Sequence, residues 1–150
     1  MIYTDLTRKA MEICYQVHAG QRDKAGTPYV FHPYHLAEQM ETEQTVCAAL
    51  LHDVLEESDM TAADLTAAGF PAEIVEAVVL LTHEKQTPYL EYVAALLENP
   101  IARAVKEADV QHNADLSRLP VVTTHDRMRM EKYAGAKALF AAHPAQKKVL

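Results

Sequence analysis

Several features that mark secreted, membrane or nucleic-acid-binding proteins are scarce or missing in this sequence. Only two of the 150 residues are cysteines, too few for a framework of several disulfides. Cys14 and Cys47 fall at apolar positions of predicted helices, so we expect buried free thiols. No apolar run approaches the ~20 residues of a membrane span, and residues 1–5 lack the basic and apolar regions of a signal peptide. We therefore expect a cytoplasmic protein that does not bind membranes.

Basic residues are also scarce, since 14 Lys and Arg stand against 21 Asp and Glu, giving a formal net charge of −7. This balance argues against nucleic-acid binding, which requires a basic face. A phosphorylated small molecule remains a suitable ligand if a metal ion and a few local bases offset the negative field. Repeats and low-complexity tracts are absent, and 150 residues that are 49% hydrophobic fit one domain spanning residues 1–150.

No segment alternates between apolar and polar residues in the manner of a strand, so the sequence predicts no sheet. Helical periodicity, capping residues and the Gly and Pro positions instead predict an all-α domain of about seven or eight helices. The expected helices cover residues 5–19, 33–40, 43–57, 61–69, a segment from 71, a segment from 88, 100–120 and 123–142. The tail from 143 to 150 is expected to fray.

The predicted helix over residues 43–57 combines a core-facing stripe with a reactive end. The stripe consists of Cys47, Leu50, Leu51 and Val54, and the ionisable groups are His52, Asp53, Glu56 and Glu57. Adjacent residues on a helix point about 100° apart, so His52 and Asp53 can share an ion only if it lies beside the helix and other ligands complete its shell. The two glutamates could then orient water or move protons. Taken alone, such a pair more often reflects ordinary surface or core polarity.

A second group of polar residues lies on roughly one face of the predicted helix over residues 100–120. Lys106, Asp109, His112 and Asn113 occur at i, i+3, i+6 and i+7. In isolation, this pattern also fits a Lys–Asp pair beside a hydrogen-bonded core histidine. His32 is expected at the start of the helix that begins at Pro33. Combined with the first group, the sequence offers four candidate metal ligands, namely His32, His52, Asp53 and Asp109.

Four segments, in this order and spacing, resemble the HD-domain alarmone hydrolases, the (p)ppGpp-degrading half of the RelA/SpoT group, and especially its small stand-alone members. The segments are residues 18–21, 26–33, 48–56 and 106–113. The resemblance implies one ion, usually Mn²⁺, held by His32, His52, Asp53 and Asp109, with Glu56 and Glu57 supporting the attacking water. It also implies hydrolysis of the 3′-pyrophosphate ester, which yields GDP or GTP and pyrophosphate.

Basic and amide side chains near these segments are candidates for binding the substrate. Arg22, Lys24 and Lys106 are the bases best placed to hold the remaining phosphates, and Asn113 and Arg118 complete the candidate set. For Arg22 and Lys24, an exposed charged loop without a binding role is an equally suitable interpretation.

The sequence departs from the family pattern at three places. Asp23 stands where the family has an arginine that lies against guanine, residues 114–116 read Ala-Asp-Leu in place of Met-Arg-Thr, and Glu57 replaces an aspartate. A carboxylate cannot stack on a base as a guanidinium does, and it repels phosphate. The base preference is therefore open, and the alternatives are hydrolysis of another nucleotide, such as an adenine alarmone or NADPH, and a regulatory module that binds a phosphorylated ligand or a partner protein without turnover.

Overall fold

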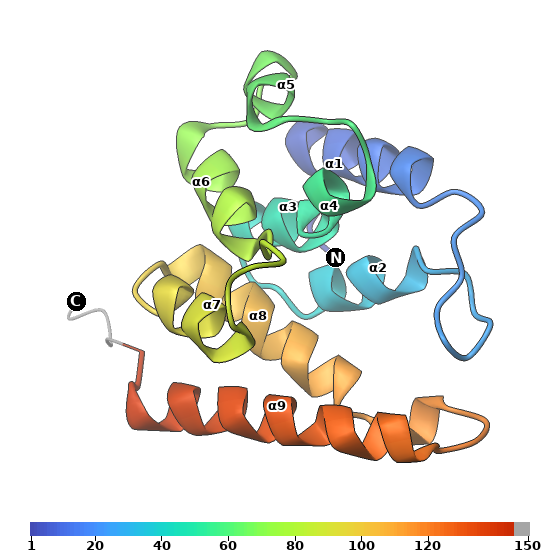
Figure 1. The fold of residues 1–150 in the computed structure, drawn as a ribbon. Coiled ribbons are helices and arrows are strands. Elements are labelled where there is room, and N and C mark those ends of the chain that lie inside the picture. Colours follow the sequence, from blue (N-terminus) through green and yellow to red (C-terminus); the bar gives the residue numbers. More distant parts are fainter. Residues whose placement is uncertain (146–150) are drawn as a thin grey trace.

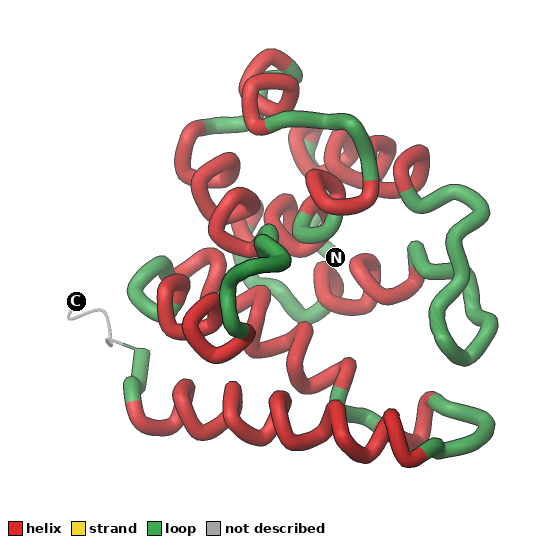
Figure 2. Tube along the Cα trace, in the orientation of Figure 1, coloured by secondary structure: helices red, strands yellow, loops and turns green. Residues whose placement is uncertain are grey.

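The computed structural model describes residues 1–145, and within them the regular structure is helical, with no strand (Figures 1 and 2). All eight predicted helices are present, and the third is divided in two. The α-helices are α1 (Asp5–Val17), α2 (Phe31–Glu38), α3 (Glu43–Leu51), α4 (Val54–Glu57), α5 (Ala62–Ala67), α6 (Ala72–Leu81), α7 (Tyr89–Leu96), α8 (Pro100–Asn113) and α9 (Thr124–Ala142), and a 3₁₀ turn, η1, covers Leu116–Arg118.

Helix α3 lies at the centre of the fold. Its residues from Val46 to Leu51 are all buried, because this run is apolar on every face and can only be covered by surrounding helices. Helices α1, α2, α6 and α8 pack against it (Figure 1). The C-terminal end of α3, where His52 follows, therefore lies inside the molecule.

Side-chain caps fix where several of these helices begin. Thr4, Thr61 and Thr123 each form a capping box, and Asn99 caps α8 ahead of Pro100, as the sequence indicated. Each cap supplies an acceptor to a backbone N–H that has no partner within the helix. A fixed start also fixes which residues of a helix face the core, and this sets the direction of Asp109 on α8.

The predicted continuous helix over residues 43–57 is wrong, because the chain breaks at His52 and Asp53. The buried imidazole of His52 is bonded through Nδ1 to the Ala49 carbonyl at 2.7 Å, and the backbone N–H of His52 approaches the same carbonyl at 3.5 Å. The Ala49 carbonyl is thus bonded by the residue three positions later, whereas in an α-helix it would be bonded by the residue four positions later. Asp53 then leaves helical geometry, with φ −106° and ψ 0°. The break frees the two side chains from the 100° separation of a regular helix.

Two other predicted boundaries also move. The helix expected over 100–120 ends at Asn113, and the Asp115 side chain accepts the Ser117 N–H to start η1. Helix α2 begins at Phe31, so His32 lies in its first turn, as expected for a residue near the helix start. The tail expected to fray from 143 lies partly outside the described residues. Among residues 1–145, no helix has both the length and the apolar character needed to cross a bilayer.

Candidate metal centre and its cavity

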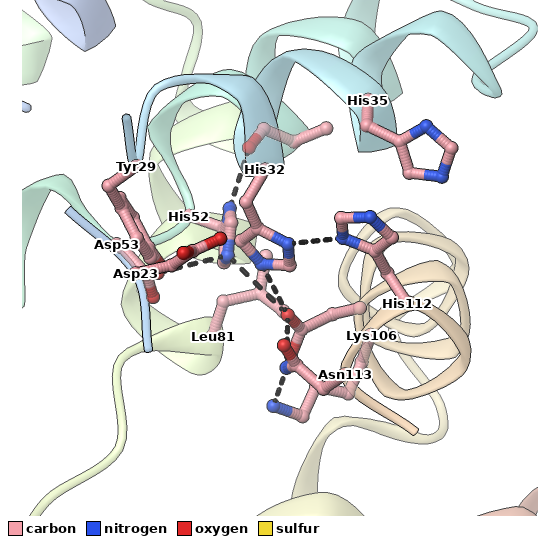
Figure 3. A network of polar contacts seen from close by, with 12 residues as sticks. Asp23, Tyr29, His32, His35, His52, Asp53, Leu81, Lys106, His112 and Asn113 are labelled. Atoms are coloured by element: carbon pink, nitrogen blue, oxygen red, sulfur yellow. Dashed lines mark hydrogen bonds and ion pairs between the residues drawn. The ribbon is translucent and has the colours of Figure 1, made fainter. Parts of the chain in front are cut away.

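His32, His52 and Asp109 come together from α2, the end of α3 and α8. Each of these buried residues offers one ligand atom, and the three atoms all lie within 4.8 Å of one another. His32 Nε2 lies 2.9 Å from Asp109 Oδ1, and His52 Nε2 lies 3.7 Å from the same oxygen. Figure 3 shows the two imidazoles side by side. Three of the four predicted metal ligands therefore form one buried cluster that could hold a metal ion.

His52 shows that the cluster suits a cation. Its Nδ1–H donates to the Ala49 carbonyl, so in the neutral ring the lone pair lies on Nε2, where a proton or a metal ion can bind. Within residues 1–145 this buried Nε2 has no hydrogen-bond partner, although it faces carboxylate oxygens of Asp53 at 3.2 Å and Asp109 at 3.7 Å. A lone pair facing two carboxylates is repulsive unless a positive charge lies between them. Imidazole nitrogens with carboxylate oxygens form a donor set for a divalent transition metal.

The pKa values of the cluster reflect the same preference for positive charge. Burial alone would lower the pKa of His52, but Asp53 and Asp109 outweigh it and raise this pKa to about 9. Burial acts in the opposite sense on Asp53, where His52 prevails and lowers the pKa to about 2. Burial also opposes ionisation of Asp109, where Lys106 and the two histidines outweigh it and hold the pKa of that carboxyl well below its usual value. Both carboxylates are thus ionised at neutral pH, as metal ligands must be.

Asp53, the fourth predicted ligand, lies beside the cluster but outside the group of three. Its Oδ2 accepts a hydrogen bond from the Tyr29 hydroxyl, and it is more exposed than the other candidate ligands. The Tyr29 ring also contacts the rings of His18 and His32, with interplanar angles of 57° and 51°. The hydroxyl of Tyr29 therefore holds the Asp53 carboxylate near His52 Nε2, at the edge of the cluster.

Lys106 lies behind Asp109. Its Nζ donates to Asp109 Oδ2 at 2.8 Å, and it sits over the rings of Tyr89 at 5.4 Å and Tyr92 at 4.9 Å. Lys106 is only 8% exposed, and it is not among the described residues that line the cavity below. Its charge is thus directed at the candidate metal ligand Asp109, whereas the sequence predicted a contact with substrate.

The two predicted catalytic glutamates follow the break, on α4. Glu56 Oε1 accepts the backbone N–H of His83 at 2.5 Å, and Glu57 Oε2 is 3.4 Å from the amide nitrogen of Gln21. Loss of solvation raises the pKa of Glu56, against the opposing effect of the His83 N–H. A carboxyl group with a raised pKa takes up a proton more readily near neutral pH.

A cavity of about 440 Å³ opens beside His32. Five other predicted site residues line it, namely Arg22, Lys24, Glu57, Asn113 and Arg118, and the remaining lining residues are Gln21, Asp23, Ala25, Tyr29, Asp115, Leu119 and Arg129. Asn113 also donates to Asp109 Oδ1 at 3.0 Å. The cavity thus joins the buried cluster, through His32 and Asn113, to a group of basic side chains.

Asp23 organises the loop that forms one wall of this cavity. Its Oδ1 accepts the backbone N–H groups of Ala25 and Thr27 at 2.9 and 3.0 Å, and its Oδ2 lies 3.4 Å from Nη2 of Arg118. The turn is completed by Gly26, whose φ of +83° favours glycine. Both oxygens of Asp23 are therefore used, and one of them orients a guanidinium at the cavity.

Tyr29 and Arg129 are cavity residues that the sequence did not identify as functional. Tyr29 precedes the candidate ligand His32 by three residues, and an aromatic hydroxyl so near a candidate ligand was the available signal. Arg129 comes from α9 and pairs with Asp126 at 2.6 Å, while its buried Nε has no partner among the described residues. No sequence pattern connects this arginine to the cluster, because only the folding of α9 across α8 brings it there.

The sequence profile of the HD domain family matches residues 10–126. This chain is an HD-domain protein. The matched region contains the whole His32–His52–Asp109 cluster, with Asp53 and the two glutamates of α4.

Several curated relatives of this HD domain are named as pyrophosphohydrolases, and one, from Myxococcus xanthus, is named "GTP pyrophosphokinase". The human protein "Guanosine-3′,5′-bis(diphosphate) 3′-pyrophosphohydrolase MESH1" is 34% identical over 124 residues, which cover 73% of this chain and 69% of the relative. "Probable guanosine-3′,5′-bis(diphosphate) 3′-pyrophosphohydrolase" of Mycoplasma pneumoniae is 40% identical over 81 residues. "Guanosine-3′,5′-bis(diphosphate) 3′-pyrophosphohydrolase" of Vibrio cholerae is 31% identical over 131 residues. These matches cover 51% and 83% of this chain but only 11% and 19% of the two bacterial proteins.

A solved structure described as a metazoan ortholog of SpoT that hydrolyses ppGpp and plays a role in starvation responses has the same fold. It superposes with a TM-score of 0.68, at 21% identity, over 96% of this chain and 98% of that one. The all-helical HD fold predicted from the sequence is confirmed.

Proposed function

We propose that this HD domain is a metal-dependent phosphohydrolase that removes the 3′-pyrophosphate of (p)ppGpp-type nucleotides. Water and ppGpp or pppGpp would give pyrophosphate and GDP or GTP, with cleavage of the bond between the 3′ oxygen and phosphorus. The observation that carries the proposal is the position of His32, which belongs both to the buried ligand cluster and to the wall of the basic cavity. The names of the relatives, MESH1 among them, support the choice of substrate.

His32, His52 and Asp109 would hold one divalent ion, and Asp53 would complete the donor set from the edge of the cluster. We favour Mn²⁺, which the resemblance to the alarmone hydrolases implies and which the two carboxylates suit, although two imidazoles with two carboxylates equally fit Fe²⁺ or Zn²⁺. When bound, such an ion supplies charge stabilisation at phosphoryl oxygens and lowers the pKa of water.

The cavity residues would bind the phosphates and position the nucleotide. Arg22, Lys24 and Arg118 provide positive charge, and Asn113 provides an amide donor beside Asp109. Arg129 adds a guanidinium whose Nε has no partner within residues 1–145. Arginine suits this role because its planar fork can donate two parallel hydrogen bonds to one phosphate.

Glu56 and Glu57 would act on the attacking water, one by accepting its proton and the other by orienting it. Glu56 is anchored by the His83 N–H and has a raised pKa, whereas Glu57 lines the cavity. These differences support separate roles for the two carboxylates, in which Glu56 accepts the proton and Glu57 orients the water beside the cavity wall. Lys106 would act through Asp109, whose Oδ2 it neutralises, and not on substrate.

A second candidate is hydrolysis of another nucleotide, either an adenine alarmone or a ribose-phosphorylated nucleotide such as NADPH. The observation in its favour is Asp23, whose carboxylate is bound to its own loop and to Arg118. Asp23 therefore offers no cationic surface for a base to stack on, and any such contact would come from Arg118 or Arg22.

The deciding experiment is product analysis with metal-stripped protein. The protein is incubated with ppGpp, pppGpp, their adenine counterparts and NADPH, each with and without Mn²⁺, and the products are separated by anion-exchange chromatography. We expect Mn²⁺-dependent release of pyrophosphate from the guanine compounds. Turnover confined to another compound would favour the second candidate, and metal binding without any turnover would favour a regulatory module.

Asp109→Ala is the matched negative control, because it removes a ligand from the centre of the cluster. We expect this variant to lose both metal and activity. Full retention of metal by a folded Asp109→Ala protein would contradict the proposed ligand set.

The proposal includes a cytoplasmic setting and a small-molecule nucleotide as the partner. Cys14 and Cys47 are buried and free, as expected from the sequence and as is usual for proteins in a reducing compartment. The net charge of −7 gives no support to nucleic acid or membrane surfaces as partners.

A further inference from the structure

His112 lies directly against a proposed metal ligand without being in the ligand cluster. Its Nδ1 is 2.7 Å from Nδ1 of His32, and the two rings are nearly parallel, with 8° between their planes and 5.0 Å between their centroids. Figure 3 shows His112 on α8 facing His32 from the side away from His52. At this separation, one of the two Nδ1 atoms donates a proton and the other accepts it.

The metal cluster decides which of the two donates. His32 Nε2 lies 2.9 Å from Asp109 Oδ1 and is its nitrogen on the cluster side. A nitrogen that binds a metal uses its lone pair and carries no proton. The proton of a neutral His32 must then reside on Nδ1, and His112 Nδ1 must accept it, which leaves the proton of His112 on its own Nε2.

We propose that His112 is a positioning residue for the metal centre, which accepts the Nδ1–H of His32 and so directs the Nε2 lone pair of His32 at the ion. This inference rests on the metal-dependent function proposed above. His52 has the equivalent arrangement, in which the Ala49 carbonyl accepts its Nδ1–H at 2.7 Å. A carbonyl oxygen can only accept, whereas an imidazole must be in the correct tautomer to do so. The acceptor for His32 is therefore a side chain that substitution can remove.

His35 provides a matched control on the other side of His112. Its ring centroid lies 4.2 Å from that of His112, with 33° between the planes, and it is exposed. The contact between His35 and His112 is therefore one of ring packing at the surface. Its loss tests packing around His112 without removing the acceptor for His32.

The test is the affinity of the full-length protein for Mn²⁺, measured by competition with a chromophoric chelator in the absence of nucleotide. Loss of an outer hydrogen bond to a metal-binding histidine weakens metal affinity by about 10- to 100-fold, and we expect this for His112→Phe, which keeps an aromatic ring but no acceptor. His112→Asn offers an amide oxygen near the position of Nδ1 and should recover most of the affinity. For His35→Phe we expect a change of less than about threefold, as for a surface contact.

A second readout reports the tautomer itself. In ¹⁵N-histidine NMR spectra of the Zn²⁺-loaded protein, chosen because Zn²⁺ is diamagnetic, His32 should show a protonated Nδ1 whose hydrogen exchanges slowly with water. In His112→Phe, this hydrogen should exchange faster. The thermal unfolding midpoint of each metal-free variant separates these effects from loss of folding.

Three results would overturn the inference. The first is unchanged Mn²⁺ affinity in His112→Phe, and the second is a His112→Asn protein as weak as His112→Phe, which would indicate packing alone. The third is a Zn²⁺-loaded protein in which His32 Nδ1 carries no proton. Failure of the proposed function is distinguishable, because absence of nucleotide hydrolysis leaves the metal affinities unaffected, whereas a wild-type protein that binds no divalent metal overturns both proposals.

Discussion

At the scale of single residues, the arrangement separates carboxylates that would bind metal from carboxylates that would move protons. Asp53 and Asp109 lie next to imidazoles or Lys106, and their pKa values are lowered. Within residues 1–145 Glu56 forms no ion pair, and desolvation raises its pKa. The same functional group is thus held ionised at one place and made more basic at the other, because of its surroundings.

We predict that Glu56→Gln lowers kcat about 100-fold or more, the usual contribution of a general base, while metal content is retained. Glu56 must be ionised to accept a proton, and its pKa is raised. Activity should therefore fall as the pH falls through that pKa, at a higher pH than for a free glutamate. The check is kcat against pH at saturating Mn²⁺, with metal content measured at each pH. In Glu57→Gln, activity should still fall at low pH as in the wild type. If this fall disappears in Glu57→Gln but remains in Glu56→Gln, the base is Glu57.

Replacement of Lys106 by Met tests the buried pair with Asp109. The ammonium and the carboxylate are 2.8 Å apart, and both are almost fully buried. Removing one partner of such a pair leaves an unpaired charge and costs about 3 kcal/mol, so the unfolding free energy of the metal-free protein should fall by about that amount.

Lys132→Met is the matched control for this change. Lys132 also sits over the Tyr89 ring, at 5.0 Å, but it is exposed. An exposed cation over an aromatic ring contributes about 1 kcal/mol or less. Equal losses of stability in the two variants, measured by urea unfolding, would show that the Asp109 pair has no special importance.

At the scale of elements, the loop after α1 illustrates how a departure from the family pattern is accommodated. Asp23 joins two backbone N–H groups of its own turn and the Arg118 guanidinium of η1. An acidic residue in place of the family arginine therefore still leaves a guanidinium at the cavity, supplied from a segment about 95 residues later in the chain.

Substitution of Asp23 should change substrate binding more than chemistry. We expect Asp23→Ala to raise KM about tenfold, because it removes the loop hydrogen bonds and the orientation of Arg118, and one lost polar interaction of about 1.4 kcal/mol has this effect. Asp23→Asn keeps an oxygen for the backbone N–H groups and should lie closer to the wild type. Steady-state kinetics on both variants, with whichever nucleotide the product analysis shows to be hydrolysed, provide the check. A large fall in kcat with unchanged KM would place Asp23 in the chemical step.

The break between α3 and α4 marks what could and could not be predicted from the sequence. Apolar periodicity located the helix and its polar end, because both follow from the spacing of side chains along one segment. The break at His52 depends on a hydrogen bond from a buried imidazole to Ala49, and no residue with a strong helix-breaking tendency stands there. The sequence therefore predicted candidate ligand residues, but not the break that allows the neighbours His52 and Asp53 to face one centre.

At the scale of the whole molecule, contacts between distant segments explain the remaining differences. Arg129 reaches the cavity only because α9 packs across α7 and α8 (Figure 1). Lys106 was expected to contact the substrate. The sequence shows that Lys106 lies one helical turn before Asp109, but it does not show that the Tyr89 and Tyr92 rings cover the ammonium group. Local patterns thus predicted the helices and the ligand types, whereas the lining of the cavity depends on packing that no single segment encodes.

The ligand cluster also joins parts of the fold that are far apart in sequence, so metal binding should stabilise the entire protein. An ion held by His32, His52 and Asp109 links α2, the end of α3 and α8. A ligand at a hundredfold excess over its Kd adds about 2.7 kcal/mol to the folded state, which raises Tm by about 5 to 10 °C for a chain of this size. We expect this shift when Mn²⁺ is added to metal-stripped protein and its reversal by a chelator.

The matched comparison is Asp109→Asn, which preserves the size of the side chain but removes the charge that binds the ion. In this variant the Mn²⁺-induced shift in Tm should fall to about 1 °C or less, because a neutral amide is a much poorer ligand for a divalent ion. Mg²⁺ should produce a smaller shift than Mn²⁺ in the wild type, since Mg²⁺ prefers oxygen ligands and binds imidazole poorly. Equal Mn²⁺ shifts in the wild type and in Asp109→Asn would place the stabilising ion elsewhere on this acidic protein. A shift confined to the wild type would instead link the stability of the whole fold to the cluster that we propose as its metal centre.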